Sequence, residues 1–262
     1  MKKIILDTDT GSDDAVAIVM ALRDPGVRVL ACTTVSGNIE VEQATYNCLQ
    51  SIDYAGTYRP PVYKGARRPL QEEYENADQV HGQDGMGDLG TLRRPADSPA
   101  PEFAVDALLR LLREGAGDIE LVAIGPLTNL ARLVTARPDL IEKIRVISLM
   151  GGAAKGGNVT PYSEVNIYND PEAAATVFAC GAPIIMCGLD CTRDCYLTDG
   201  ERAQLRQAHR DPLSQVLCDG LEWYAASNAR FGENCVIHDA LAVGCLAYPE
   251  LLHTSPYYVD IC

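Results

Sequence analysis

Short apolar runs and stretches of helical periodicity alternate along most of this chain. Apolar runs typical of buried strands occupy residues 4–6, 27–35, 62–65, 119–124, 146–150 and 183–187. Apolar residues recur at helical spacing over residues 15–23, 42–55, 102–114, 127–136, 171–179, 199–209, 212–229 and 238–247, and residues 257–261 are expected to be extended. This alternation predicts an α/β fold with a mainly parallel, doubly wound, Rossmann-like sheet and helices on both faces. Because no repeat or low-complexity linker interrupts the pattern, we expect residues 1–262 to form a single domain.

Two polar segments interrupt the alternation. Residues 66–101 carry proline, glycine and charge with little periodicity, and a segment of that length is too long for a plain connector. We therefore expect a functional loop there, with His81 in its middle, inside the glycine-rich sequence HGQDGMG. A second polar loop is expected over residues 156–170, before Pro171 opens the next helix at its preferred first position.

Four carboxylates crowd the corner between the first strand and the first helix. Asp7 and Asp9 follow the apolar run, and Asp13 and Asp14 lie where the helix begins. Like charges this close raise one another's pKa unless a cation lies between them, and carboxylate oxygens favour calcium or magnesium over zinc. The alternative is a capped helix with solvated acids. Open α/β sheets place their sites at the carboxyl ends of strands, so a cation site is the favoured interpretation.

Composition narrows the range of partners. A net charge of −14 argues against nucleic acid or an anionic membrane, because both bind basic patches. The sequence has no apolar run long enough to span a membrane and enters its first strand without a signal-peptide region, which predicts a cytoplasmic protein. Ten cysteines are present, and Cys187, Cys191 and Cys195 recur at a four-residue spacing. Without an export signal, reduced thiols are favoured over a metal site for these three.

Seven sequence blocks together carry a resemblance to a known family. DTDTGSDDA, at residues 7–15, resembles the DxDxGxDDA signature of the nucleoside hydrolases, the inosine-uridine preferring N-ribohydrolase family. Further blocks follow in the order expected for that family: TTVSGN (33–38), HGQDGMG (81–87), GPLTN (125–129), MGG (150–152), GNVTPYSEVNIYNDPEAA (157–174) and HDALA (238–242). The resemblance implies the nucleoside hydrolase fold and a homodimer or homotetramer. It also implies that the usual C-terminal segment is absent, because the chain stops at Cys262 within a stretch expected to be extended.

The resemblance implies one Ca²⁺ bound by the carboxylates of Asp9, Asp14 and Asp239 and by the backbone carbonyl of Thr128. Ca²⁺ takes about six to eight oxygen ligands, so such a site leaves room for a water and two sugar hydroxyls. By match to the family, Asp9 is the general base for that water. The implied reaction is attack of the water on C1′ of a ribonucleoside of the inosine, uridine and cytidine class. The N-glycosidic bond breaks through an oxocarbenium-like transition state, giving free base and ribose for purine and pyrimidine salvage.

Substrate contacts follow from the same resemblance. The residues that match ribose-binding positions are Asp13, Asn38, Asn158, Glu164 and Asn166, with Met150 against the sugar. A leaving base needs a proton or hydrogen bonds, and histidine is the side chain best suited to supply them near neutral pH. His238 is the expected leaving-group acid, and His81 the expected base or ribose contact. The segment WYAASNARFGEN (residues 223–234) is expected to hold base-contacting side chains, with Tyr224 as a candidate.

Two other functions remain open on sequence alone. DxDxT also opens the haloacid-dehalogenase phosphatases, in which Asp7 would be the nucleophile and Asp9 the acid/base of a magnesium-dependent enzyme. That interpretation leaves HDALA and GNVTPYSEVN unexplained. A non-catalytic, calcium-stabilised nucleoside-binding protein is the second alternative.

Overall fold

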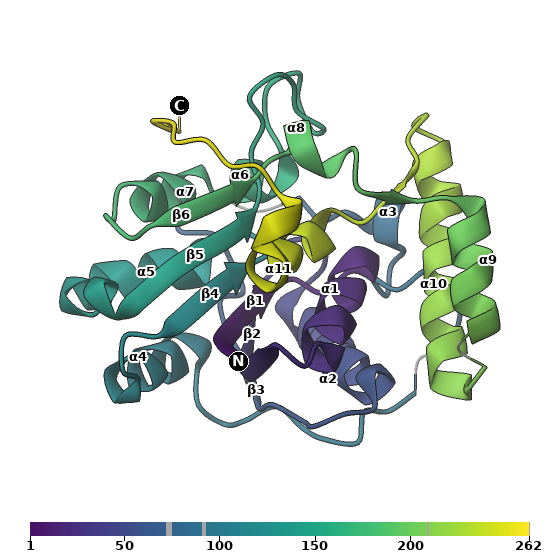
Figure 1. Cartoon of the computed structure of the whole chain (residues 1–262), viewed down its shortest axis with the longest axis horizontal. Coiled ribbons are helices and arrows are strands. Elements are labelled where there is room, and N and C mark those ends of the chain that lie inside the picture. Colours follow the sequence, from purple (N-terminus) through teal and green to yellow (C-terminus); the bar gives the residue numbers. More distant parts are fainter. Residues whose placement is uncertain (72–74, 91–92, 209, 262) are drawn as a thin grey trace.

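The central feature of the computed structural model is a six-stranded sheet with the order β3-β2-β1-β4-β5-β6 (Figure 1). Its strands are β1 (Lys2–Thr8), β2 (Val27–Thr34), β3 (Val62–Lys64), β4 (Ile119–Ala123), β5 (Ile144–Met150) and β6 (Ile184–Cys187). Every pairing between neighbouring strands is parallel, which confirms the predicted α/β fold with a doubly wound sheet. The structure describes residues 1–71, 75–90, 93–208 and 210–261.

Helices pack on both faces of the sheet, as the side chains of β1 require. Ile4 and Leu6 point to one face, and Ile5 points to the other. The first face is covered by α1 (Ser12–Arg23), α2 (Val41–Ala55) and α11 (His238–Ala247). The second is covered by α4 (Ala104–Glu114), α5 (Thr128–Ala136) and α7 (Pro171–Phe178). Each face of the sheet therefore has its own buried apolar core.

The strands that flank β1 bring distant segments to the same edge of the sheet. Asp7 pairs with Thr33 of β2 and with Ala123 of β4, so these three strands end side by side. The first turn of α1 follows directly from this edge (Figure 1). Because α11 packs on α1, its N-terminus reaches the same region from late in the chain. The carboxyl edge is where open parallel sheets place their sites.

The last third of the chain adds helices outside the sheet. α8 (Leu189–Thr192), α9 (Asp199–Ala208) and α10 (Pro212–Ala229) follow β6, and α9 and α10 lie side by side at one end of the molecule (Figure 1). A small antiparallel sheet pairs β7 (Tyr196–Leu197) with β8 (Cys235–Val236), just before α11. Among the described residues, no helix has both the length and the apolar composition needed to cross a lipid bilayer.

The structure differs from the predicted elements mainly at their ends. α1 begins at Ser12 rather than residue 15, which puts Asp13 and Asp14 inside its first turn. The helix predicted over residues 199–209 ends at Ala208, and His209 lies outside the described residues. Residues 257–261, predicted to be strand-like, belong to neither sheet. Further short helices are α3 (Asp78–His81), inside the long polar segment, α6 (Val165–Asn169), and two 3₁₀ turns, Pro138–Lys143 and Pro249–Leu251.

The nine described cysteines are free thiols. Cys187, at the end of β6, has its sulfur 3.1 Å from that of Cys245 in α11. Cys191 is exposed, and its thiol donates to the Gly188 carbonyl oxygen at 3.2 Å. Cys187 and Cys245 are therefore part of the buried packing between β6 and α11, whereas Cys191 lies at the surface.

Candidate active site

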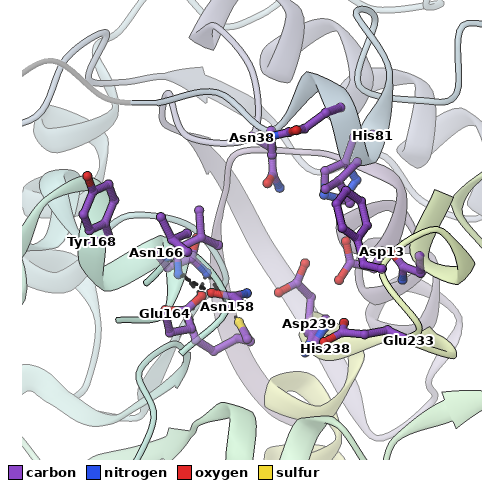
Figure 2. A pocket seen from close by; sticks show the side chains of 18 of the residues that line it. Asp13, Asn38, His81, Asn158, Glu164, Asn166, Tyr168, Glu233, His238 and Asp239 are labelled. Carbon is purple, nitrogen blue, oxygen red and sulfur yellow. Dashed lines mark hydrogen bonds between the residues drawn. The ribbon is translucent and has the colours of Figure 1, made fainter. Parts of the chain in front are cut away.

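A cavity of about 550 Å³ opens at the carboxyl edge of the sheet (Figure 2). Most residues that the sequence assigns to the site line it: Asp13, Asn38, His81, Met150, Asn158, Glu164, Asn166, His238 and Asp239. Asp9 and Asp14 are buried and are not among the described residues that line the cavity, but their charges act on Asp239, which does line it. A concave, mixed polar and apolar cavity of this size suits a small molecule.

Asp13 and Asp239 line the cavity, and together with the buried carboxyl groups of Asp9 and Asp14 they make up what is here called the acidic floor. Carboxylate oxygens of Asp13, Asp14 and Asp239 all lie within 4.8 Å of one another. Asp9 interacts electrostatically with this group, because the charges of Asp14 and Asp13 both raise its pKa. Three of the four come from the corner between β1 and α1, and Asp239 comes from the first turn of α11. The fold thus adds a distant fourth carboxylate to the corner that the sequence identifies.

Burial and mutual repulsion raise the pKa values of the acidic floor. Burial and the charge of Asp14 together raise the pKa of Asp13 to about 8. Burial first, and then the charges of Asp13, Asp14 and Asp9, raises the pKa of Asp239 well above its ordinary value. The same two causes raise the pKa of Asp9. Carboxyls arranged in this way retain protons near neutral pH unless a cation replaces those protons.

The Asp9 carboxylate is confined by glycine backbone on both sides. A Cβ atom on Gly37 would overlap Asp9 Oδ2, and one on Gly125 would come within 2.8 Å of Oδ1. The Asn38 backbone N–H donates to Oδ2 at 2.6 Å, whereas Oδ1 is buried and has no hydrogen-bond partner in the described part of the chain. A buried carboxylate oxygen is costly unless a proton or a cation meets it. Oδ1 is therefore an atom that this arrangement offers to a cation.

Asp14 is oriented by three donors. Its Oδ1 accepts from Thr8 Oγ1 at 2.6 Å, and its Oδ2 accepts from the Gly11 backbone N–H at 2.9 Å and from Asn38 Nδ2 at 3.1 Å. The bonds from Thr8 and Gly11 lower the pKa of Asp14 but do not outweigh burial, which raises it. Asn38 thus bonds to both Asp9 and Asp14 and also lines the cavity.

Thr128 and Ile124 differ in their access to the cavity. Thr128 is the first residue of α5, its hydroxyl donates to Asp170 Oδ2 at 2.5 Å, and it is not among the described residues that line the cavity. Ile124, which the sequence analysis missed, does line the cavity. Its carbonyl oxygen lies 3.4 Å from Asn166 Nδ2, a long and therefore weak hydrogen bond. Ile124 is an apolar residue directly after β4, and no motif of polar side chains marks it as part of the site.

Glu164 and Asn166 form a polar wall across the cavity from Asp13 and Asp239 (Figure 2). Glu164 accepts backbone hydrogen bonds from Gly152 at 2.9 Å and from Asn166 at 3.0 Å, which opposes the rise in its pKa that burial causes. Asn166 Nδ2 donates to the Met150 carbonyl oxygen at 3.1 Å. These bonds fix both side chains before any ligand binds, as the predicted contacts with sugar hydroxyls require.

Two neutral histidines line another side of the cavity. His81 Nδ1 accepts from the Ser12 backbone N–H at 3.2 Å, and its ring stacks on Tyr224 with centroids 5.3 Å apart. His238 Nδ1 lies 2.8 Å from Thr192 Oγ1. Burial is the main cause that lowers the pKa of His81 to about 3 and that of His238 to about 4. Each ring is therefore uncharged at neutral pH and carries a single N–H.

The cavity also includes residues that the sequence analysis did not name individually. Tyr168, Arg193, Asn228, Phe231 and Glu233 line it, together with the candidate Tyr224. We call Tyr224, Asn228, Phe231 and Glu233 the base wall. They lie within WYAASNARFGEN, at the end of α10 and in the turn that follows. The sequence analysis expects base contacts in this segment but does not say which side chains make them, because contact of α10 with α3 and α1 is what brings them to the cavity.

Asp7 does not reach the cavity. Its Oδ1 accepts from Thr33 Oγ1 at 2.5 Å and from Asn129 Nδ2 at 2.8 Å, and it is not among the described residues that line the cavity. A phosphatase nucleophile must touch its substrate. The haloacid-dehalogenase alternative, which needs Asp7 in that role, is therefore not favoured.

Known proteins resemble this chain over nearly its whole length. The sequence profile described as inosine-uridine preferring nucleoside hydrolase matches residues 4–262. The pyrimidine-specific ribonucleoside hydrolase RihA of Photobacterium profundum is 38% identical over 263 residues, which cover 99% of this chain and 84% of that protein. The non-specific ribonucleoside hydrolase RihC of Escherichia coli is 40% identical, over 98% of this chain and 83% of that protein. A solved structure, the purine-preferring ribonucleoside hydrolase from Gardnerella vaginalis, has a TM-score of 0.93 at 34% identity, covering 99% of this chain and 84% of that one.

Proposed function

This chain belongs to the inosine-uridine preferring nucleoside hydrolase family and hydrolyses the N-glycosidic bond of ribonucleosides, and we propose that it does so with one Ca²⁺ at the acidic floor. One observation carries the proposal: Asp9, Asp13, Asp14 and Asp239 gather in one buried cluster, and two of them, Asp13 and Asp239, line a cavity with polar walls. Crowding four carboxylates in a buried place is unfavourable unless a cation balances them.

The donor set fits a hard divalent cation. As the family resemblance implies, Asp9, Asp14 and Asp239 would hold it, and Asp9 Oδ1 has no other partner among the described residues. Ile124 is better placed than Thr128 to supply a backbone carbonyl, because Ile124 lines the cavity. Oxygen ligands of irregular arrangement favour Ca²⁺ over Mg²⁺. When bound, the cation offsets the repulsion within the acidic floor and lowers the pKa of a coordinated water.

Asp9 is the proposed general base. A water oxygen forms a bond to C1′ as its proton passes to the Asp9 carboxylate, and the C1′–N bond breaks with its electron pair leaving on the base. The polar wall of Glu164 and Asn166 would hold the ribose hydroxyls, with Asp13, Asn38 and Asn158 as further ribose contacts and Met150 against the sugar. The base departs with its new electron pair accepting a hydrogen bond from the N–H of His238, with His81 beside it, and takes up a proton from solvent before release, while Asp9 returns its proton to solvent. A neutral imidazole can serve as such a donor.

The proposed substrates are ribonucleosides of the inosine, uridine and cytidine class. The neutral rings of His81, His238 and Tyr224 suit a flat, uncharged base, and a net charge of −14 disfavours phosphorylated substrates. The relatives are named as pyrimidine-specific, non-specific and purine-preferring enzymes, so family membership does not determine which base is preferred. We expect that preference to depend on the base wall of this chain. Family membership also supports a cytoplasmic homodimer or homotetramer that acts in purine and pyrimidine salvage.

Ribose release from uridine and inosine tests the proposed function. We expect release from at least one nucleoside with Ca²⁺, a rate at least about tenfold lower after the metal is stripped, and recovery when Ca²⁺ is added back. Asp9→Asn should abolish release. Asp199→Asn, whose side chain is 98% exposed at the start of α9, is the matched control and should leave the rate unchanged. Nucleoside binding without ribose release by the wild type would instead support the non-catalytic alternative.

A further inference from the structure

We propose that Thr192 is a positioning residue that makes the cavity-facing nitrogen of His238, Nε2, a hydrogen-bond donor to the leaving base. The inference rests on the proposed function, because it assigns a partner to the histidine that would assist departure of the base. Thr192 carries out no chemistry itself. It would determine which of the two ring nitrogens of His238 carries the proton.

The two nitrogens of His238 have different surroundings. Thr192 Oγ1 lies 2.8 Å from Nδ1, and Thr192 is fully buried. His238 lines the cavity, whereas Thr192 is not among the described residues that do. Nδ1 is therefore occupied on the protein side, which leaves Nε2 for a ligand.

The direction of the hydrogen bond follows from the partners available. A hydroxyl can donate or accept, and a neutral imidazole has one donor nitrogen and one acceptor nitrogen. Among the described residues, His238 Nδ1 is the hydrogen-bond partner of Thr192 Oγ1, so no other group is there to accept the hydroxyl proton. The hydroxyl proton is thus directed at Nδ1, and Nε2 keeps the ring proton. If the ring takes up a second proton, Nε2 remains a donor, so the assignment does not depend on the charge of His238.

His81 provides an internal comparison. Its Nδ1 faces the Ser12 backbone N–H at 3.2 Å, a group that can only donate. Neutral His81 must therefore carry its proton on Nε2. The two histidines of the cavity reach the same tautomer, one through a backbone amide and the other through a threonine hydroxyl.

Backbone contacts hold Thr192 in register with His238. The Ile237 N–H, directly before His238, donates to the Cys195 carbonyl oxygen at 2.9 Å, and the Cys195 N–H donates to the Thr192 carbonyl oxygen at 2.8 Å. The pairing of β7 with β8 continues this connection through Tyr196 and Val236. The small antiparallel sheet thus fixes α8 against the start of α11, which keeps the hydroxyl within hydrogen-bonding distance of the ring.

The test compares two substrates that differ in their need for a donor. Uridine requires help for its leaving base, whereas p-nitrophenyl β-D-ribofuranoside releases a phenolate that leaves readily without a proton. For Thr192→Val, which keeps the shape and removes the hydroxyl, we expect kcat on uridine to fall about tenfold or more with KM nearly unchanged. Hydrolysis of the nitrophenyl riboside should stay within about threefold of wild type, since its transition state does not need the donor. Thr192→Ser should restore most of the uridine rate.

Thr176→Val is the matched control, because its hydroxyl donates to the Glu172 carbonyl oxygen within α7, away from the cavity. It should change neither rate. Equal losses on both substrates for Thr192→Val would show a merely structural role and overturn the inference, as would an unchanged uridine rate. If the wild type hydrolyses neither substrate, the proposed function falls and this inference falls with it.

A spectroscopic measurement keeps the inference testable if Thr192→Val does not fold. Long-range ¹H–¹⁵N spectra of the wild type distinguish the two neutral tautomers of histidine, and His238→Gln assigns the signal. We expect the Nε2–H tautomer for His238. The Nδ1–H tautomer in the wild type would overturn the inference.

Discussion

The acidic floor and the base wall border the same cavity, but the fold holds them in different ways. The floor carboxylates are all buried, and Asp9 and Asp14 receive hydrogen bonds from the backbone around the ends of β1 and β2. In the base wall, Tyr224 is buried, but Phe231 is 61% exposed and Glu233 is exposed as well. The floor is thus fixed by the sheet, whereas half of the base wall lies in a surface turn.

This difference separates the proposed chemistry from the choice of substrate. A scaffold with a rigid reactive end and a more open recognition end can change specificity without rebuilding its catalytic groups. Relatives with different named base preferences, all similar to this chain over at least 98% of its length, fit that division. Substitutions in the floor should therefore affect all substrates alike, and substitutions in the base wall should affect them selectively.

Among the variants that compare floor with base wall, Asp14→Asn should have the largest effect. The change keeps the shape of the side chain but removes a charge from the floor, so kcat/KM should fall by about 10³-fold on every substrate, and Ca²⁺ affinity should fall with it. Ribose-release kinetics and calorimetric Ca²⁺ titration measure the two effects. A loss confined to one nucleoside would break the division between floor and base wall.

His238→Ala should have the next largest effect. Loss of the donor should lower kcat on uridine by about 10²-fold, while the nitrophenyl riboside is hydrolysed at nearly the wild-type rate. His253→Ala, outside the cavity, is the control. If hydrolysis of both substrates slows equally, His238 supports the reaction at the acidic floor rather than departure of the base. The division between floor and base wall would then fail at this position.

The dependence of stability on pH should identify the floor as the site of cation binding. The pKa of Asp13 is raised from 3.8 to about 8, so the folded protein keeps a proton that the unfolded chain releases. Between those values the metal-free protein therefore loses stability as the pH rises. Because Ca²⁺ competes with that proton, saturating Ca²⁺ should raise Tm by about 5–10 °C at pH 8 and by much less at pH 5. Calorimetry with and without chelator at each pH measures the difference, and an equal gain at both pH values would contradict it.

The smallest expected effect comes from Phe231→Ala. Because Phe231 is exposed at the edge of the cavity, its loss should leave Tm within about 1–2 °C of wild type. The ratio of kcat/KM for inosine to that for uridine should change by about three- to tenfold, since the larger base loses more contact. Competition between the two nucleosides in one reaction measures this ratio directly. An unchanged ratio would place the choice of base elsewhere in the cavity.

The sheet and the acidic corner could be predicted from the sequence because both follow from patterns of residues that are close together along the chain. Ile4 to Leu6 and the carboxylates at positions 9, 13 and 14 follow one another in the chain, and strand-to-helix periodicity sets their geometry. The predicted fold class and family are confirmed. Asp239 could be joined to them only through the family resemblance, since no local pattern relates it to the first strand.

The segment that holds the base wall could be predicted, but its individual side chains and the partner of His238 could not. Phe231 and Glu233 lie in a turn without periodicity, and their place depends on how α10 packs against the rest of the fold. β7 and β8 have two residues each, too few for an alternating pattern to be visible. The role of Ile124 rests on its backbone carbonyl, and that group is the same in every residue. Long-range packing and backbone chemistry are thus what the sequence left undetermined.

The glycines beside Asp9 have a thermodynamic consequence. A carboxylate that rotates freely loses roughly 1 kcal/mol of rotamer entropy when an ion fixes it. Here the oxygens of Asp9 occupy the space in which Gly37 and Gly125 would otherwise carry a Cβ atom, so the side chain is already immobile once the chain has folded. That entropy is lost during folding rather than during binding. An ion arriving at Asp9 therefore meets a ligand that has no freedom left to lose.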